Sequence, residues 1–461
     1  MDEDDILTGV SFTDPAKFDF DPRMYHWGTL HLHLTNILLD GAKTIGYFKQ
    51  PWRGSYYNLL PGEFERVYRL GRWLSVCFGL LSIVAVYLLG YEVDGSRTAL
   101  WAAAITAASP AHLLASTQIR VDLTMLTFVL LAAWLGLRSF RIHSAGLLFG
   151  FGVVCGLAIT AKYTAAAIVI PLMVIVLCSR RTPAHLLAAI AGLAAGVIAG
   201  SPYLLTRWPE MWRQFTEAAA FGQPVPPRFA LSIPALLVLQ AQNVARFAVG
   251  PVAALLCIAG IWILLRRRST AAAVVLVALV GSIFALVPLK WPLLRYDLLL
   301  LPWLAITAGV ALTQMKPRRR WPIGITAIIF PLAGSVAQTH YMRCEHPANR
   351  ALATILKTVP PGTAIARLTV EMPPLDRKIY PMGPNPLLDD LTAQPPEWVL
   401  TTDLADVEDP PENRALLAKD YDEVASFRCN RILSWATLGE SGAPHDWKYT
   451  HPAMALYRRV R

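Results

Sequence analysis

The sequence predicts an all-α polytopic membrane protein that carries a small α/β domain at its C-terminal end. Of its 461 residues, 54% are hydrophobic and 16% are charged, whereas soluble proteins carry roughly 25% charged residues. Long apolar runs follow one another through the middle of the chain, and polar residues become frequent again after residue 340. Arginines stand in short clusters between the apolar runs. These observations together predict the fold class.

The formal net charge of +10 would suggest a nucleic-acid-binding protein if basic and aromatic residues formed a surface module. In this sequence the arginines lie between apolar runs, where they set the topology of a membrane protein. We therefore expect membrane lipids as partners and no nucleic acid.

Residues 1–69 are expected to form a first extracytoplasmic loop. This segment opens on the acidic residues Asp2 to Asp5 and lacks the basic and apolar regions of a secretory signal peptide. Further on, residues 25–48 place Leu30, Leu34 and Leu38 at helical spacing between polar residues. This stretch is too polar to span a bilayer, and it predicts a helix at the membrane interface.

Residues 70–340 are expected to form the membrane domain. Their apolar runs approach the roughly 20 residues that a helix needs to cross a bilayer. We expect about ten spans, at residues 73–91, 99–118, 121–138, 144–161, 163–178, 185–205, 247–265, 271–289, 295–314 and 321–339.

Basic residues mark alternate connections between these runs. They are Arg97, Arg138 with Arg141, Arg180 with Arg181, Arg266 to Arg268, and Lys316 with Arg318 to Arg320. The positive-inside rule places these connections in the cytoplasm, so the other connections and both termini face outward. This predicts a multi-pass protein of the inner (plasma) membrane with an extracytoplasmic site. Because a chain that starts outside is difficult to insert, we also expect a further N-terminal helix upstream of this sequence.

Residues 341–461 are expected to form a soluble α/β domain on the outer face. The pattern predicts a helix at 349–357 and strands at 363–370, 397–402, 421–427 and 453–459. This part also contains Cys344 and Cys429, which could form a disulfide if it lies outside the cytoplasm. The other four cysteines lie in apolar runs, where a cysteine behaves as a small hydrophobic residue.

Several polar residues are candidates for chemistry. The acidic residues Asp2, Glu3, Asp4 and Asp5 could supply a general base or bind a hard divalent cation, or could form a solvated terminus. His26 and His33 could share a helical face, but a metal site needs a further ligand, and we expect no metal there. Cations at outward span ends, Arg72, Arg120, Lys162 and Arg295 among them, could bind phosphate oxygens or simply extend towards the membrane surface.

The order of several motifs resembles the GT-C superfamily of integral-membrane glycosyltransferases. The motifs are DEDDIL, DPAKFDFDPRMYHWGTLHLHL, YRLGRWLS, SPAHLLASTQIRVDLTML, GLAITAKYTAAAIVIP and KWPLLRYDLLLLPWLA. Within the superfamily, the chain is similar to a bacterial branch of the dolichyl-phosphate-mannose protein mannosyltransferases. The resemblance covers roughly residues 2–315.

This resemblance implies a hexosyl- or pentosyltransferase that uses a polyprenyl-phosphate-linked sugar at the outer membrane face. It makes Asp2 and Glu3 the expected catalytic pair and matches Arg120 with Asp122, and Lys162 with Tyr163, to family motifs. The acceptor would be a glycan, a lipid or a protein. No cofactor is implied with certainty, although a divalent cation is compatible with the acidic residues. The remaining substrate-binding candidates in this sequence are Asp21, His26, Arg72, Arg295 and Tyr296.

The sequence departs from the family pattern in two places. It lacks the span that precedes the Asp-Glu pair in relatives, and it has Tyr25-His26-Trp27-Gly28 where relatives often show a Pro-containing motif. The second departure predicts a different acceptor preference.

Two other classes of function fit the same composition. A transporter or flippase of a lipid-linked or anionic solute would be expected to show internal repeats and polar sites near the bilayer midplane, whereas here no repeat is found and the charges collect at span ends. A non-catalytic scaffold would use the C-terminal domain to bind a partner.

Overall fold

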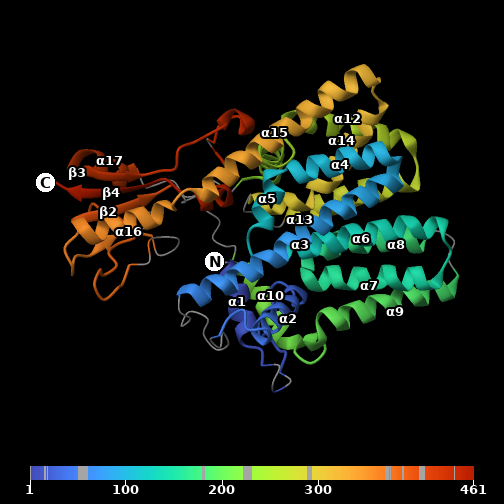
Figure 1. Cartoon of the computed structure of the whole chain (residues 1–461), viewed down its shortest axis with the longest axis horizontal. Coiled ribbons are helices and arrows are strands. Elements are labelled where there is room, and N and C mark those ends of the chain that lie inside the picture. The colour runs from blue at the N-terminus through green and yellow to red at the C-terminus, as the bar shows by residue number, and fades with distance from the viewer. Residues whose placement is uncertain are drawn as a thin grey trace. The chain divides into compact units, whose positions relative to one another are not determined.

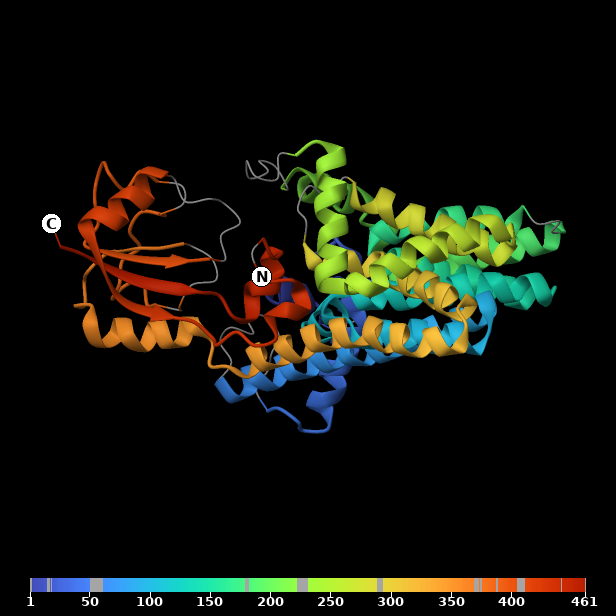
Figure 2. The ribbon, with the colours of Figure 1, turned by 90° about the horizontal axis from the view of Figure 1, so that it is seen from above.

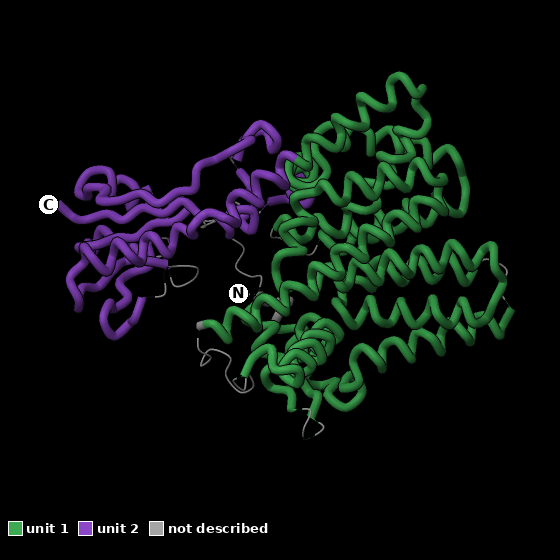
Figure 3. Tube along the Cα trace, in the orientation of Figure 1, with its two compact units in different colours: residues 1–224, 237–332 green, residues 225–236, 333–461 purple. Residues whose placement is uncertain are grey.

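In the computed structural model, the described residues are 2–14, 17, 19–49, 61–178, 182–221, 231–287, 293–368, 373, 375–386, 389–403, 411–440 and 442–460. They fall into two compact units, shown in two colours in Figure 3. Unit 1 comprises Met1–Pro224 and Leu237–Leu332, and unit 2 comprises Val225–Leu236 and Ala333–Arg461. The division predicted from the sequence, at residues 69 and 340, remains a prediction.

Most of the helices that precede residue 344 are labelled in Figure 1. Their bounds are α1 (Asp2–Ser11), α2 (Leu30–Thr44), α3 (Pro61–Asp94), α4 (Ser96–Ala108), α5 (Pro110–Ser116), α6 (Val121–Arg141), α7 (Ala145–Ala161), α8 (Ala166–Leu177), α9 (Pro183–Gly200), α10 (Trp208–Phe221), α11 (Ile233–Asn243), α12 (Pro251–Arg267), α13 (Thr270–Leu286), α14 (Leu301–Gln314) and α15 (Pro317–Arg343).

Each apolar run singled out in the sequence falls on helical structure, so a mostly helical fold with several apolar helices is confirmed. Among the described residues, four helices are long and apolar enough to cross a membrane, or up to six if each bent pair is one span. Four shorter apolar helices account for the remaining runs. The total of about ten spans remains a prediction.

Several of these runs are broken where the sequence suggested continuous helices. The run at 99–118 bends by 63° between α4 and α5, at Ser109-Pro110, because proline cannot donate a backbone hydrogen bond and disfavours a helical residue before it. The run at 295–314 begins with a 3-10 turn, η7 (Leu294–Leu299), before α14. The second of these segments carries Arg295 and Tyr296, which belong to the candidate site described below.

The long helices of unit 1 run side by side in both ribbon views (Figure 1, Figure 2). Neighbours in the bundle follow the order α9, α7, α6, α3, α4, α14 and α12. Helices α7 and α9 approach closely because glycines face each other across their contact. A Cβ at Gly152 would lie 2.1 Å from the Ala189 carbonyl oxygen, and one at Gly196 would lie 2.1 Å from that of Val153. Small residues at four-residue spacing let membrane helices approach in this way.

Carboxylates pair with the arginines at the predicted cytoplasmic ends of the bundle. Glu92 of α3 lies 2.7 Å from Arg141 and 3.6 Å from Arg138, both on α6. Asp94, also on α3, lies 2.5 Å from Arg267 of α12. These pairs tie α3 to α6 and to α12 at the same end. The predicted pair Arg180–Arg181 lies outside the described residues.

Unit 2 contains a four-stranded sheet in the order β1-β2-β4-β3. Its strands are β1 (Ile365–Ala366), β2 (Trp398–Thr402), β3 (Tyr421–Phe427) and β4 (Met454–Arg459). β1 and β2 are parallel, and the other pairs are antiparallel. Helix α16 (Pro347–Thr358) buries Ala351 and Ile355 against the sheet. The predicted α/β organisation is thus observed, with one helix, α17 (Pro411–Asp420), that the pattern did not predict.

Candidate functional site

Helix α1 carries the acidic opening of the chain and is anchored by its apolar face. Ile6, Leu7 and Val10 are fully buried and pack with Leu32 and Leu39 of α2. The acidic residues occupy the first turn of α1, where carboxylates interact favourably with the positive end of the helix dipole. The packing of α1 on α2 therefore holds the acidic turn in place. Asp2 belongs to α1, but its side chain lies outside the described residues.

Glu3 connects three parts of unit 1. Its two carboxylate oxygens accept hydrogen bonds from the guanidinium of Arg72 on α3, at 2.9 and 2.8 Å. One of them also accepts a hydrogen bond from the backbone N–H of Ile119, at 2.9 Å, just before α6 begins. On the same acidic turn, Asp4 accepts a hydrogen bond from the hydroxyl of Tyr68, also on α3. Two predicted site residues, Glu3 and Arg72, thus form a paired contact.

A buried ion pair lies at the start of α6. The Nζ of Lys162, directly after α7, lies 2.7 Å from a carboxylate oxygen of Asp122, and both side chains are largely buried. Arg295, from η7, and Arg120 are close enough to act electrostatically on the same carboxylate. These four side chains, one carboxylate and three cations, together carry a formal charge of +2 (3 − 1). The fold therefore assembles a cationic site from residues far apart in the chain.

Two further contacts organise the cationic side chains. The ring of Tyr296 has Lys162 Nζ at 5.4 Å and the Arg295 guanidinium carbon at 5.2 Å from its centroid, distances at which an aromatic face attracts a cation. Arg120 is buried, and its Nε donates a hydrogen bond to Gln118 at 2.6 Å. Tyr296 and the three cations, all predicted from the sequence, are thus brought together with Asp122.

Asp21 is buried in the loop that precedes α2. Its carboxylate accepts hydrogen bonds from the hydroxyl of Tyr25, from the backbone of Arg23, and from Arg207 at 3.2 Å. Burial, followed by the bond to Asp21, raises the pKa of Tyr25 well above its usual value. The contacts of Asp21 thus join the N-terminal loop to the segment before α10 rather than to the Asp122 cluster. His26 lies nearby in the chain, with its ring 4.2 Å from that of Trp27.

The buried polar atoms that have no hydrogen-bond partner among the described residues include His31 Nε2, His33 Nε2 and the Tyr163 hydroxyl oxygen. The other ring nitrogen of His31 lies 2.8 Å from the hydroxyl of Thr124 on α6. Burial lowers the pKa of His31 to about 4 against the opposing effect of Asp122, and burial likewise lowers the pKa of His33 to about 4. Both imidazoles are therefore neutral at physiological pH.

Sequence reasoning predicted Tyr163 as a site residue but missed His31. The backbone N–H of Tyr163 donates to the carbonyl of Trp27 at 3.2 Å, which draws the N-terminal loop onto the end of α7. The alternation His31-Leu32-His33 in a helix expected at the interface was the available signal. It did not distinguish a buried histidine from an exposed one, because that depends on α6 packing beside α2.

The described residues contain no group of three or more His, Cys, Asp or Glu side chains arranged to hold a metal ion. A divalent cation at the acidic turn therefore remains a prediction.

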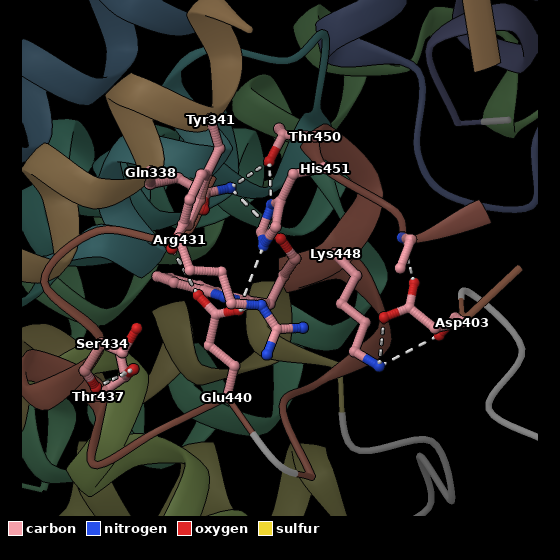
Figure 4. A network of polar contacts seen from close by, with 12 residues as sticks. Gln338, Tyr341, Asp403, Arg431, Ser434, Thr437, Glu440, Lys448, Thr450 and His451 are labelled. Atoms are coloured by element: carbon pink, nitrogen blue, oxygen red, sulfur yellow. Dashed lines mark hydrogen bonds and ion pairs between the residues drawn. The ribbon is translucent and has the colours of Figure 1, made fainter. Parts of the chain in front are cut away.

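A separate polar network lies in unit 2 (Figure 4). The buried carboxylate of Glu440 accepts a hydrogen bond from the hydroxyl of Tyr341 at 2.8 Å and pairs with Arg431 at 3.1 Å. His451 stacks on Tyr341, with ring centroids 3.9 Å apart. Burial alone would raise the pKa of Glu440, but these neighbours hold it below its usual value. Gln338 of α15 donates to Thr450, so the network fastens the end of α15 to the C-terminal segment.

Residues 64–205 match the sequence model of the dolichyl-phosphate-mannose-protein mannosyltransferase family. The resemblance to the GT-C superfamily is confirmed. The matched segment contains Arg72, Arg120, Asp122, Lys162 and Tyr163. No protein of curated function matches the sequence.

Solved structures of two membrane-enzyme relatives, ArnT and an archaeal oligosaccharyltransferase, resemble this chain. ArnT from Cupriavidus metallidurans in the apo state is 14% identical, with a TM-score of 0.52 over 98% of this chain and 93% of that chain. Its complex with undecaprenyl phosphate gives 15% identity and a TM-score of 0.43 over 94% and 88%. The Archaeoglobus fulgidus oligosaccharyltransferase with Zn and sulfate is 15% identical, with a TM-score of 0.44 over 77% of this chain. The match spans about half (51%) of that protein. The apo ArnT comparison shows a shared fold along nearly the whole chain.

Proposed function

We propose that this protein transfers a sugar from a polyprenyl-phosphate carrier to an acceptor at the extracytoplasmic face of the inner membrane. The observation that carries the proposal is the cationic cluster around Asp122, in which Lys162, Arg295 and Arg120 outnumber the carboxylate. Excess positive charge held in a largely buried site suits a phosphate, because the charges act through a low local dielectric. The ArnT relative, which shares the fold, is itself known in complex with undecaprenyl phosphate.

The chemistry of glycosyl transfer gives these cations a role. The bond from the sugar to the phosphate breaks through an oxocarbenium-like transition state, and negative charge develops on the departing phosphate. Cations fixed before the reaction stabilise that charge without reorganising. Asp122 would keep Lys162 oriented towards the phosphate, and Tyr296 would position Lys162 and Arg295 through its ring.

The base that activates the acceptor would come from the acidic turn of α1. Glu3 is already engaged by Arg72 and by the Ile119 amide, which favours a positioning role for it. Asp2 is then the expected general base, as the family resemblance implies. His31 Nε2 and the Tyr163 hydroxyl, which lack protein partners among the described residues, would hydrogen-bond sugar hydroxyls, and His26 would contact the acceptor.

The predicted orientation agrees with this assignment of roles. The arginine pairs with Glu92 and Asp94 lie at one end of α3, and Arg72 lies towards the other end. By the positive-inside rule the first end faces the cytoplasm, so Arg72 and the acidic turn bound to it would face outward. A lipid-linked donor could then reach the site from the outer leaflet.

The proposal is tested by Asp2→Asn in the full chain, purified and reconstituted with a panel of polyprenyl-phosphate sugars. Loss of covalent sugar transfer with unchanged donor binding is the expected result, because the substitution removes a base and leaves the cations intact. Asp5→Asn, on the same helix, is the matched control and should retain activity. Unchanged turnover in Asp2→Asn would exclude Asp2 as the base. Uptake of the donor into proteoliposomes without covalent change would instead support a transporter.

A further inference from the structure

Two cysteines of unit 2 meet although they lie far apart in the sequence. Cys344 directly follows α15, and Cys429 lies two residues after the end of β3. Both are half-buried free thiols, and they lie close enough for Cys344 to act electrostatically on the Cys429 thiol. The approach is supported nearby, where Arg350 of α16 donates to the carbonyl of Arg428 at 3.2 Å.

We propose that Cys344 and Cys429 form a disulfide bond in the mature protein. Thiols that lie close together need only a small movement to reach bonding distance, provided that the backbone allows it. The elements that precede the two cysteines end shortly before them: α15 ends at Arg343 and β3 ends at Phe427. Each cysteine therefore lies in a connection, where a small backbone adjustment disturbs no helix or strand.

The pairing is specific within the chain. The sequence has six cysteines, and the other four, Cys77, Cys155, Cys178 and Cys257, belong to or directly follow apolar helices of unit 1. Cys344 and Cys429 are the two cysteines of unit 2. A thiol oxidant acting on unit 2 would thus have one pair available, and mispairing within that unit is not possible.

The bond would stabilise the exposed side of the sheet. Among the described strands, β3 lies at the edge of the order β1-β2-β4-β3 and pairs with β4, and an edge strand has unpaired backbone groups on one side. Joining residue 429 to residue 344 closes a long loop that contains α16, β1, β2, α17 and β3. Closing a long loop restricts the unfolded chain and so favours the folded unit.

The redox step balances with an oxidant of the cell envelope. The two thiols lose two protons and two electrons, and one sulfur–sulfur bond forms. The electrons reduce the disulfide of a thiol oxidase through a mixed-disulfide intermediate, which leaves that enzyme as a dithiol. This step rests on the extracytoplasmic placement of unit 2 in the proposed function, because thiols in the cytoplasm are kept reduced.

The test is to trap free thiols in intact cells with a membrane-permeant alkylating reagent and then to map the peptides of the full-length protein by mass spectrometry without reduction. The expected result is a linked peptide pair containing residues 344 and 429, two hydrogen masses lighter than the two free peptides. After reduction, the two peptides should separate and react with a second alkylating reagent. Cys429→Ser should lack the linked pair and leave Cys344 alkylated, and Cys257→Ser should retain the link.

Alkylation of both residues before reduction would overturn the disulfide. Copper phenanthroline added to the purified protein then separates two causes of that result. If the oxidant links the pair, the geometry is right and the orientation of unit 2 in the proposed function is wrong. If it does not, the two cysteines are not within bonding reach.

Discussion

The contact between Glu3 and Arg72 allows a structural role and a catalytic role to be separated by a charge swap. We consider Glu3→Arg and Arg72→Glu, singly and together. The Arg72 side chain is 48% exposed and that of Glu3 is 20% exposed, so the ion pair itself should contribute at most about 1 kcal/mol. Glu3→Arg also removes the carboxylate oxygen that accepts a hydrogen bond from the Ile119 amide. The loss of this acceptor costs about 1 kcal/mol more.

Each single variant should therefore lower the free energy of unfolding, by about 2 kcal/mol for Glu3→Arg. The double variant restores the ion pair but not the acceptor for Ile119, so roughly half of that loss should be recovered. Thermal unfolding of the detergent-solubilised full chain measures the difference in stability between the variants. Equal stability of the double and the single variants would refute the conclusion that this pair fastens α1 to α3.

The same variants report on chemistry through sugar transfer. If Glu3 only positions the acidic turn, transfer should recover together with stability in the double variant. If stability recovers and transfer does not, the carboxylate at position 3 acts in the reaction itself.

Three further predictions concern the buried polar groups. Lys162→Met should lower the turnover number on the order of 100-fold, because a preorganised cation near the leaving phosphate is lost; sugar-transfer kinetics measure this effect. The same substitution should lower the stability of the protein, because it leaves the buried Asp122 carboxylate without its partner; thermal unfolding measures that effect. His31→Phe keeps a ring but removes Nε2, so donor binding should weaken about fivefold, the equivalent of about 1 kcal/mol, with little change in melting temperature. Glu440→Gln should destabilise unit 2 by about 2 kcal/mol, visible as faster hydrogen exchange in β4 of the full chain.

Each of these predictions has a control or a contrary outcome. Addition of Asp122→Asn to Lys162→Met should recover stability but not turnover, and recovery of turnover would exclude the cationic role. Thr124→Val, which loosens the His31 ring without removing Nε2, should weaken donor binding less than His31→Phe. If it weakens binding equally, His31 acts through packing alone.

The Glu440 prediction also has a definite pH dependence. The pKa of Glu440 is lower in the folded protein than its usual value, so its carboxylate contributes stability at pH values above the unfolded pKa. That contribution is lost as the pH falls towards the folded pKa. Acid should therefore loosen unit 2 in the natural protein, and Glu440→Gln should reduce this dependence. An identical acid profile in the two proteins would contradict the role of Glu440.

Local pattern predicted most of the individual elements well, although among the described residues the strand expected at 363–370 is limited to Ile365–Ala366. The strands near 397–402, 421–427 and 453–459 were predicted to within a residue, because alternation between turns is a local signal. The helix α16 was predicted from its spacing for the same reason. The bend at Pro110 was missed because the apolar composition continues across it, and hydropathy does not report on backbone direction.

The acidic turn of α1 shows a limit of reasoning from one segment. On its composition, Asp2 to Asp5 could be a solvated terminus, and nothing within the segment indicated how it was held. In the structure, Ile6, Leu7 and Val10 bury against α2, and Glu3 binds Arg72 on α3. The partners lie dozens of residues away, so their proximity depends on packing that no local periodicity describes.

The sequence by itself determined the membrane class, the positions of the apolar helices and the alternation of basic connections, because hydropathy and charge act along the chain. Tertiary structure alone decided that Asp122, Lys162 and Arg295 share one site, that His31 is buried beside Thr124, and that Cys344 meets Cys429. The physical reason is that these contacts join helix ends and loops whose distance is fixed by how the helices pack. Residue types can suggest such partners, but only the packing brings them together.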